Sequence, residues 1–131
     1  DTSTTKKVAA NYLYHTWASA TPTVTASSGS FTTVSCATKY FTLDGKTRFL
    51  QGLVYIADKG TADGTIYVPI PSGAAAAFGG GNWPVYGRCN TGAISAVLNV
   101  TESRIEILEY DATTAVADTM SISFGVFYEL A

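Results

Sequence analysis

The sequence predicts an all-β fold, an antiparallel β-sandwich, on three observations. Short apolar segments recur from residue 31 onward, separated by turns rich in Gly, Pro and Asp. Asp44-Gly45 stands between two such segments and is a strong hairpin signal, because both turn positions need a positive φ. No amphipathic helical pattern separates the segments, and a length of 131 residues fits one domain of this kind.

Residues 1–16 differ from the rest of the chain and predict a short helical segment. Val8 and Tyr12 lie one helical turn apart, so they share a face. A helix of this length is marginal in water by itself, so it needs neighbours in order to form. We therefore expect Val8 and Tyr12 to contribute to a subunit interface.

The Ser/Thr/Ala-rich stretch after this segment predicts a connector. It contains Pro22 and Gly29 and room for one short edge strand around Thr23–Ala26. We therefore divide the chain into an N-terminal helix and connector, residues 1–30, and a β-sandwich head, residues 31–131.

The remaining elements of the head are predicted from apolar segments and the turns between them. Five apolar-rich segments follow the first strand of the Asp44-Gly45 hairpin, and the first four of them end at turns that contain Gly, Pro, Asp or Ser. A small-residue loop is expected over residues 72–82, where glycines bound a run of alanines. The predicted strands are Val34–Leu43, Lys46–Ala57, Thr65–Val68, Ala93–Val100, Arg104–Tyr110 and Met120–Glu129.

Alternation along two strands predicts which faces are covered. From Met120 to Tyr128, every second residue is apolar, which indicates one buried face. The second hairpin strand is apolar on both faces, with Leu50, Val54 and Ile56 on one and Phe49, Leu53 and Tyr55 on the other. In a two-layer sandwich only one face is core, so we expect Phe49, Leu53 and Tyr55 to lie at an interface with a second subunit.

The charge of the chain narrows the range of partners. Only 14% of the residues are charged and the formal net charge is −2, which provides no basic surface for nucleic acid or anionic lipid. No run of about 18 apolar residues predicts a membrane span. We therefore expect no nucleic-acid partner and no membrane insertion. The small number of charges leaves apolar surface for another chain to cover.

Residue types with catalytic or metal-binding chemistry are sparse. His15 is the only histidine and lies outside the predicted sandwich, so a capping or surface role is expected. Glu102, Glu106 and Glu109 are the densest acidic set, and paired carboxylates are the catalytic groups of glycosidases, but exposed positions of a half-buried strand explain all three. Cys36 and Cys89 are expected to be small buried side chains that need no disulfide, although a bridge across the sandwich stays open. We therefore predict no enzyme, no cofactor and no metal.

One group of residues stands out as a candidate ligand site. An aromatic and polar cluster follows the glycine run at residues 79–81 and is expected to form a loop on the rigid scaffold. Aromatic faces stack on sugar rings, and Asn and Arg hydrogen-bond to hydroxyl or acidic groups. The alternative is that Trp83 and Tyr86 fill the end of the sandwich or a subunit interface. The candidate binding residues are Asn82, Trp83, Tyr86, Arg88 and Asn90.

The order of several weak motifs resembles a known family. The motifs are Gly29-Ser30-Phe31-Thr32, Lys39-Tyr40-Phe41 leading to Gly45-Lys46-Thr47, Gly64-Thr65-Ile66 leading to Pro69-Ile70-Pro71, Gly87-Arg88, Tyr110-Asp111 and Tyr128-Glu129. In this order they resemble the β-sandwich domain near the C-termini of tailed-bacteriophage tail-fibre and related virion proteins. Residues 2–9 also resemble an element that precedes many tail-fibre terminal domains, but the continuation at residues 11–15 departs from that pattern.

This resemblance implies a homotrimeric, jelly-roll-like head on a stalk, built into a virion with other virion proteins. Such a head is assembled in the host bacterial cytoplasm and acts outside the cell. It binds a bacterial surface glycan or an outer-membrane protein, and no binding residue carries over by motif. A purely structural virion module, such as a capsid- or tail-attached fibre or a trimerisation cap, is the alternative.

Overall fold

The chain forms one antiparallel sheet of nine strands within residues 16–77, 79–109 and 116–131, which the computed structural model describes. These ranges contain no helix, which confirms the all-β prediction, and hence no helix that could cross a membrane. The predicted N-terminal helix, with Val8, Tyr12 and His15, lies outside them. The strands are β1 (Ala18–Ala20), β2 (Thr25–Ser28), β3 (Thr33–Leu43), β4 (Thr47–Asp58), β5 (Asp63–Pro69), β6 (Trp83–Cys89), β7 (Gly92–Asn99), β8 (Arg104–Glu109) and β9 (Met120–Glu129).

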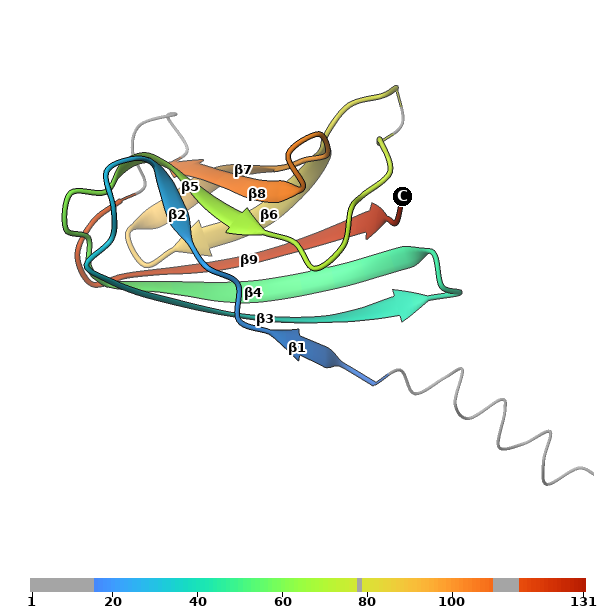
Figure 1. The fold of residues 1–131 in the computed structure, drawn as a ribbon, viewed down its shortest axis with the longest axis horizontal. Coiled ribbons are helices and arrows are strands. Elements are labelled where there is room, and N and C mark those ends of the chain that lie inside the picture. The colour runs from blue at the N-terminus through green and yellow to red at the C-terminus, as the bar shows by residue number, and fades with distance from the viewer. Residues whose placement is uncertain (1–15, 78, 110–115) are drawn as a thin grey trace, which may run out of the picture.

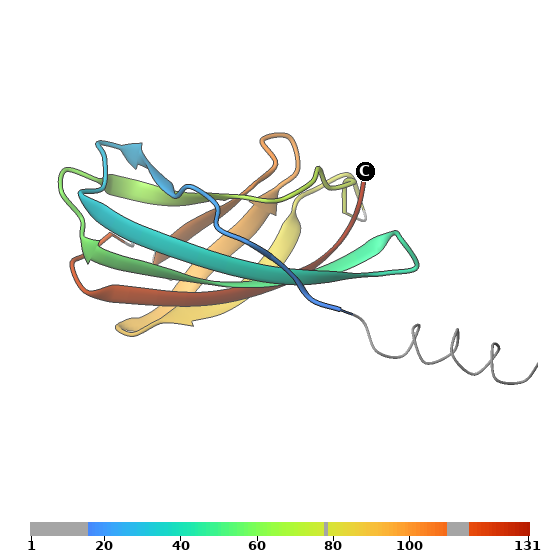
Figure 2. The same ribbon diagram turned by 60° about the horizontal axis from the view of Figure 1, so that its bottom comes forward.

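The sheet curls into a half-barrel whose two halves face each other. The strand order is β1-β3-β4-β9-β6-β7-β8-β5-β2. Figure 1 shows β1, β3, β4 and β9 in one layer and β7, β8, β5 and β2 in the other, and Figure 2 shows the same curl from a second direction. We call these layers the first and second half-sheets. This arrangement is compatible with the predicted sandwich, because apolar faces of both halves are buried between the layers.

Strand β6 is the corner that joins the two half-sheets. It pairs with β7 at Trp83–Val85 and at Arg88–Cys89, but with β9 only over Tyr86–Cys89, so β6 and β9 separate toward Trp83. At Gly87 a Cβ atom would overlap the main-chain oxygen of Ser123 on β9. Only a residue without a side chain therefore fits where the backbones of β6 and β9 meet at the corner.

The two edge strands come from the residues before the predicted head. β1 pairs with β3 and β2 pairs with β5, and only residues 21–24 connect them. The hydroxyl of Thr38 on β3 donates a hydrogen bond to the main-chain oxygen of Ala20. The expected short strand near Thr23–Ala26 thus corresponds to β2, and β1 is an additional strand that the sequence did not indicate. The predicted connector therefore supplies both edge strands of the sheet, β1 at one edge and β2 at the other.

The predicted hairpin is confirmed. Asp44 and Gly45 have φ values of 52° and 67°, as the turn requires, and the Lys46 amide donates to the Leu43 carbonyl. The turn sets the pairing of β3 with β4 from Leu43 opposite Thr47 to Val34 opposite Ile56, and the register shifts by one residue at the last pair, Thr33 with Asp58. β4 then pairs with β9 over ten residue pairs. These three long strands form most of the first half-sheet.

The core contains the alternating side chains that the sequence predicted for β4 and β9. Leu50, Val54 and Ile56 are buried, and so is every second residue of β9 from Met120 to Tyr128. Ile66, Val68, Leu98, Ile105 and Ile107 meet them from the second half-sheet. The alternation in the sequence therefore correctly predicted which face of β4 and β9 lies in the core.

A buried arginine lies at one end of this core. Arg48 is 9% exposed, its Nε donates to the Thr42 hydroxyl, and its guanidinium lies 4.4 Å from the centre of the Tyr40 ring. Arg48 is paired directly with Tyr128 in the β4–β9 ladder. Burial raises the pKa of Tyr128, against the opposing effect of the Arg48 charge, so this tyrosine stays neutral well into the alkaline range.

Cys36 and Cys89 are both free and buried thiols. This confirms the expectation that both are small buried side chains. The Cys89 sulfur lies 3.0 Å from the Thr91 hydroxyl oxygen. Burial raises the pKa of Cys36 from 9.0 to about 11, because the thiolate has no water to solvate it.

The Cys36 shift predicts a loss of stability in alkali. The unfolded thiol ionises near 9.0 and the folded thiol near 11, so the contribution of Cys36 is complete below pH 9 and is lost as the pH rises to 11. We expect the free energy of unfolding to fall more steeply over this interval in the wild type than in Cys36→Ala. Denaturant titrations at a series of pH values measure it, and equal slopes for the two proteins would contradict it.

Candidate functional site

The outer face of the first half-sheet carries most of the exposed apolar side chains that the structure describes. The sequence placed Leu53 and Tyr55 on this face, and they are 48% and 42% exposed. The other large exposed side chains here are Trp17, Leu43, Tyr86 and Phe127, the last two being more than half exposed. An apolar group of this size on one face is typical of a surface that binds something.

The strand register arranges this outer face in rows that run across the strands. One row, which we call the polar row, crosses five strands. The next row crosses four, and we call it the Leu53 row. Because side chains alternate between faces, all members of both rows point away from the core. The polar row is Ser19, Lys39, Gln51, Gly125 and Tyr86, and the Leu53 row is Ala37, Leu53, Ser123 and Arg88.

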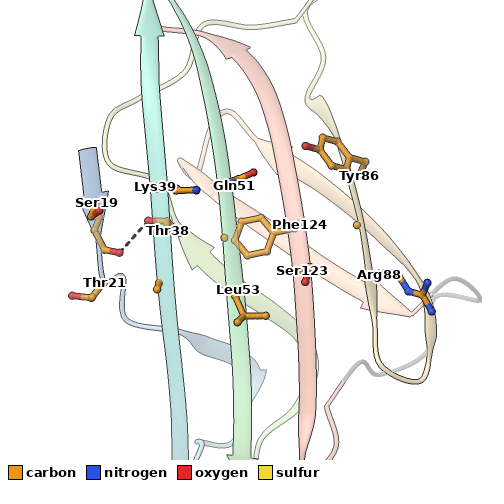
Figure 3. Close-up of a pocket in the computed structure, with 14 residues that line it drawn as sticks. Ser19, Thr21, Thr38, Lys39, Gln51, Leu53, Tyr86, Arg88, Ser123 and Phe124 are labelled. Atoms are coloured by element: carbon orange, nitrogen blue, oxygen red, sulfur yellow. Dashed lines mark hydrogen bonds between the residues drawn. The ribbon is translucent and has the colours of Figure 1, made fainter. Parts of the chain in front are cut away.

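The polar and Leu53 rows line a groove of about 870 Å³. Figure 3 shows Tyr86 and Arg88 on β6 at one side of the groove and Ser19 and Thr21 at the other. Hydroxyl and amide groups from three strands lie between them, together with the apolar side chain of Leu53. The groove therefore combines hydrogen-bonding groups with apolar surface on a rigid, five-stranded floor.

Tyr86 lies across Gly125 on the neighbouring strand. A Cβ atom at Gly125 would overlap the hydroxyl end of the Tyr86 ring, so the missing side chain is what lets the ring lie over β9. Tyr86 is nevertheless 59% exposed. One side of the ring thus rests on the sheet while much of the ring remains open to solvent, which is the arrangement of a stacking platform.

A third row on the same face is aromatic. Phe49 lies 4.4 Å from Phe127 and 5.7 Å from Phe41, between ring centres. Trp17 lies 4.7 Å from Phe41, and the Lys39 ammonium lies 4.7 Å from the centre of the Trp17 ring. We call Trp17, Phe41, Phe49 and Phe127 the aromatic row. It adjoins the groove and anchors Lys39 at its border.

The five candidate residues from the sequence do not form one cluster. Tyr86 and Arg88 line the groove, whereas Asn82 and Trp83 line a smaller hollow of about 650 Å³ between Tyr86 and Phe127. Trp83 packs against the core and its indole N–H donates to the Ala75 carbonyl over 2.7 Å. This matches the alternative that Trp83 fills the end of the sandwich.

The two asparagines of the set make structural hydrogen bonds. The Asn82 side-chain oxygen accepts from the Val100 amide. The Asn90 side chain donates to the Thr119 carbonyl and accepts from the Ser121 amide, which ties the turn after β6 to the start of β9. Neither asparagine lines the groove.

The predicted loop over residues 82–90 is wrong, because this segment is strand β6. The preceding glycine run and Pro84 suggested a loop, but β6 has only β7 beside it at Pro84, where a proline is tolerated. The alternation of Trp83, Val85 and Cys89 with Tyr86 and Arg88 was the available signal for a strand.

The acidic residues singled out in the sequence lie away from the groove. Glu106 on β8 pairs with Arg104 at 3.4 Å and accepts a hydrogen bond from the side-chain NH₂ group of Asn99. Glu102 is exposed in the turn before β8, and Glu109 ends that strand. Within the residues described, no three His, Cys, Asp or Glu side chains gather in a possible metal site.

Comparison with known proteins identifies no relative of this chain. No protein-family model, no curated protein and no solved structure matches it. What the groove can bind therefore follows from its own residues.

Proposed function

We propose that this domain is a non-enzymatic head of a bacteriophage fibre that binds a bacterial surface glycan in the groove. The observation that carries the proposal is the exposed Tyr86 ring, held over Gly125 beside the hydroxyl and amide groups of Ser123 and Gln51. Sugars present apolar ring faces and hydroxyl groups, and this pairing of a stacking ring with short polar side chains complements both. The virion setting rests on the motif resemblance.

A trimeric, jelly-roll-like head on a stalk belongs to the same proposal. The aromatic row is the proposed contact between chains, because Phe127 is 56% exposed and continuous with Trp17, Phe41 and Phe49. Val8 and Tyr12, which the sequence also assigned to the subunit interface, lie outside the described residues. Of the residues that the sequence placed at the interface, this proposal keeps Phe49 in the contact and assigns Leu53 to the groove.

A second candidate function is a purely structural virion module. The exposure of Leu53 and Tyr55 favours it, because a larger contact between chains would cover both residues and close the groove. The two candidates differ in whether Leu53 contacts another chain or a ligand. Substituting Leu53 and measuring the mass of the assembly therefore distinguishes the two functions.

Adsorption to host cells tests the glycan proposal. We expect Tyr86→Ala and Arg88→Ala to reduce binding of the domain to host cells at least about tenfold, as loss of an aromatic or arginine anchor does. Both side chains are exposed, so the melting temperatures should stay near that of the wild type. Val97→Ala and Lys59→Ala, exposed positions away from the groove, are the matched controls.

Two further experiments identify the chemical class of the receptor and test whether the Tyr86 ring is its stacking platform. Periodate treatment of the cells, which destroys glycans, should abolish adsorption, whereas protease treatment should not. Gly125→Ala should displace the Tyr86 ring and weaken adsorption although it removes no contact group. Adsorption lost after protease alone would replace the glycan with an outer-membrane protein, and normal adsorption by both Tyr86→Ala and Arg88→Ala would refute the groove as the site.

A further inference from the structure

The charges around the groove all have one sign. Lys39 borders it on β3 and Arg88 borders it on β6, and no Asp or Glu is among the described residues that line it. The chain as a whole is acidic, with a formal net charge of −2. A cationic groove on an acidic protein favours an anionic ligand over a neutral one.

The register fixes how far apart the two cations are. Lys39 lies on β3 and Arg88 on β6, three strands away in the sheet. Lys39 belongs to the polar row and Arg88 to the Leu53 row, and these rows are two residues apart along each strand. On a flat sheet this places their Cα atoms about 16 Å apart. The Lys39 ammonium extends this separation, because it lies 4.7 Å from the centre of the Trp17 ring, on the side of its row opposite to Arg88. Two cations separated in this way fit an extended ligand with a negative group toward each end.

The surroundings of each cation fit a singly charged group. Among the described lining residues, Lys39 and Arg88 are the only cations, and each has neutral neighbours in its row. A phosphate carries more charge and is usually held by several converging donors. The planar guanidinium of Arg88 binds a carboxylate with two parallel hydrogen bonds, which suits one carboxylate per cation.

We infer that the ligand of the groove is an acidic oligosaccharide whose sugar carboxylates bind Arg88 and Lys39 while one ring stacks on Tyr86. This inference rests on the proposed glycan-binding function and specifies its ligand class. Gln51 and Ser123 lie between the two cations and hydrogen-bond to the sugar hydroxyls. The apolar floor at Leu53 contacts the ring carbons.

Calorimetric titration of the intact chain with matched trisaccharides tests the inference. The probes are a hexuronic acid trisaccharide, its carboxyl-reduced neutral counterpart and a phosphorylated neutral trisaccharide. We expect the wild type to bind the hexuronate at least about tenfold more tightly than the neutral probe, the effect of hydrogen bonds to a charged group. Added salt should weaken hexuronate binding and leave neutral binding unchanged.

The variants locate the effect. Arg88→Ala should retain only about a two- to fivefold preference for the hexuronate over the neutral probe, the part that Lys39 supplies. Lys39→Ala should weaken hexuronate binding about two- to fivefold, as loss of an exposed ion pair does. Lys59→Ala removes a positive charge away from the groove and should change neither affinity.

The failures of the two proposals are distinguishable. Equal binding of acidic and neutral probes that is lost in Tyr86→Ala overturns the acidic ligand but supports the glycan site. Preference for the phosphorylated probe overturns the carboxylate assignment. No binding of any probe by a wild type whose adsorption to cells resists periodate overturns both proposals.

Discussion

Replacing Phe124 by alanine is expected to lower the free energy of unfolding by about 3–5 kcal/mol, the largest loss among the substitutions considered. Phe124 is 3% exposed at the centre of β9, next to the corner strand β6. Its ring lies over Gly52 on β4, where a Cβ atom would be 2.5 Å from the ring carbon Cζ. The ring therefore fills the space that Gly52 leaves in the core, and its removal opens a cavity there.

A double-mutant cycle makes this explanation testable. Gly52→Ala alone should cost about 1–3 kcal/mol, because the new methyl group overlaps the Phe124 ring. In the Phe124→Ala background the overlap with the ring is gone and only the contact with Thr38 Cγ2, at 2.9 Å, remains, so the same methyl group should cost clearly less. Denaturant unfolding of the four proteins measures the coupling. Additive losses would show that Gly52 and Phe124 do not share one space.

The second large effect concerns the assembly. We expect light scattering to give three times the 13.8 kDa of one chain, and Phe127→Glu to reduce this to the mass of a monomer. Phe127 is 56% exposed and its ring centre is 4.4 Å from that of Phe49, so a carboxylate here would be buried among aromatic rings at the proposed contact. Val97→Glu, at an exposed position of the second half-sheet, is the control and should leave the mass unchanged.

The same measurement separates the two candidate functions. Leu53→Glu combined with Tyr55→Glu should leave the trimer intact if the groove is open for a ligand. Dissociation by this pair would mean that another chain covers the groove and would favour the structural module. A monomeric wild type at micromolar concentration would contradict the trimer altogether.

Much of the fold could be predicted because local signals were strong. The Asp44-Gly45 turn fixed the β3–β4 hairpin, and the alternation from Met120 to Tyr128 identified the buried face of β9. Strand β6 was missed because it contains a glycine and a proline, which usually mark a loop. Here Gly87 lies at the corner between the half-sheets, and Pro84 lies where β6 has only one neighbouring strand. β1, with three residues, depends on its pairing with β3.

The candidate site was predictable only in part. Tyr86 and Arg88 were identified by residue type, but their neighbours in the groove were not. Gln51 faces Gly125 and Leu53 faces Ser123 in the β4–β9 pairing, which joins strands some seventy residues apart. No local pattern specifies such a register. The pairing of Lys39 with Gln51 was accessible, because the hairpin turn determines it.

The binding claim is tested most directly by mapping amide chemical shifts of the labelled protein while the purified surface polysaccharide of the host is added. The proposed site predicts shifts concentrated in β3, β4, β9 and β6, around Lys39, Gln51, Ser123 and residues 86–88. The amides of β5 and β8, on the second half-sheet, should not move. Shifts confined to β2, β5 and β8, or to the turn at residues 59–62, would contradict the groove as the ligand site.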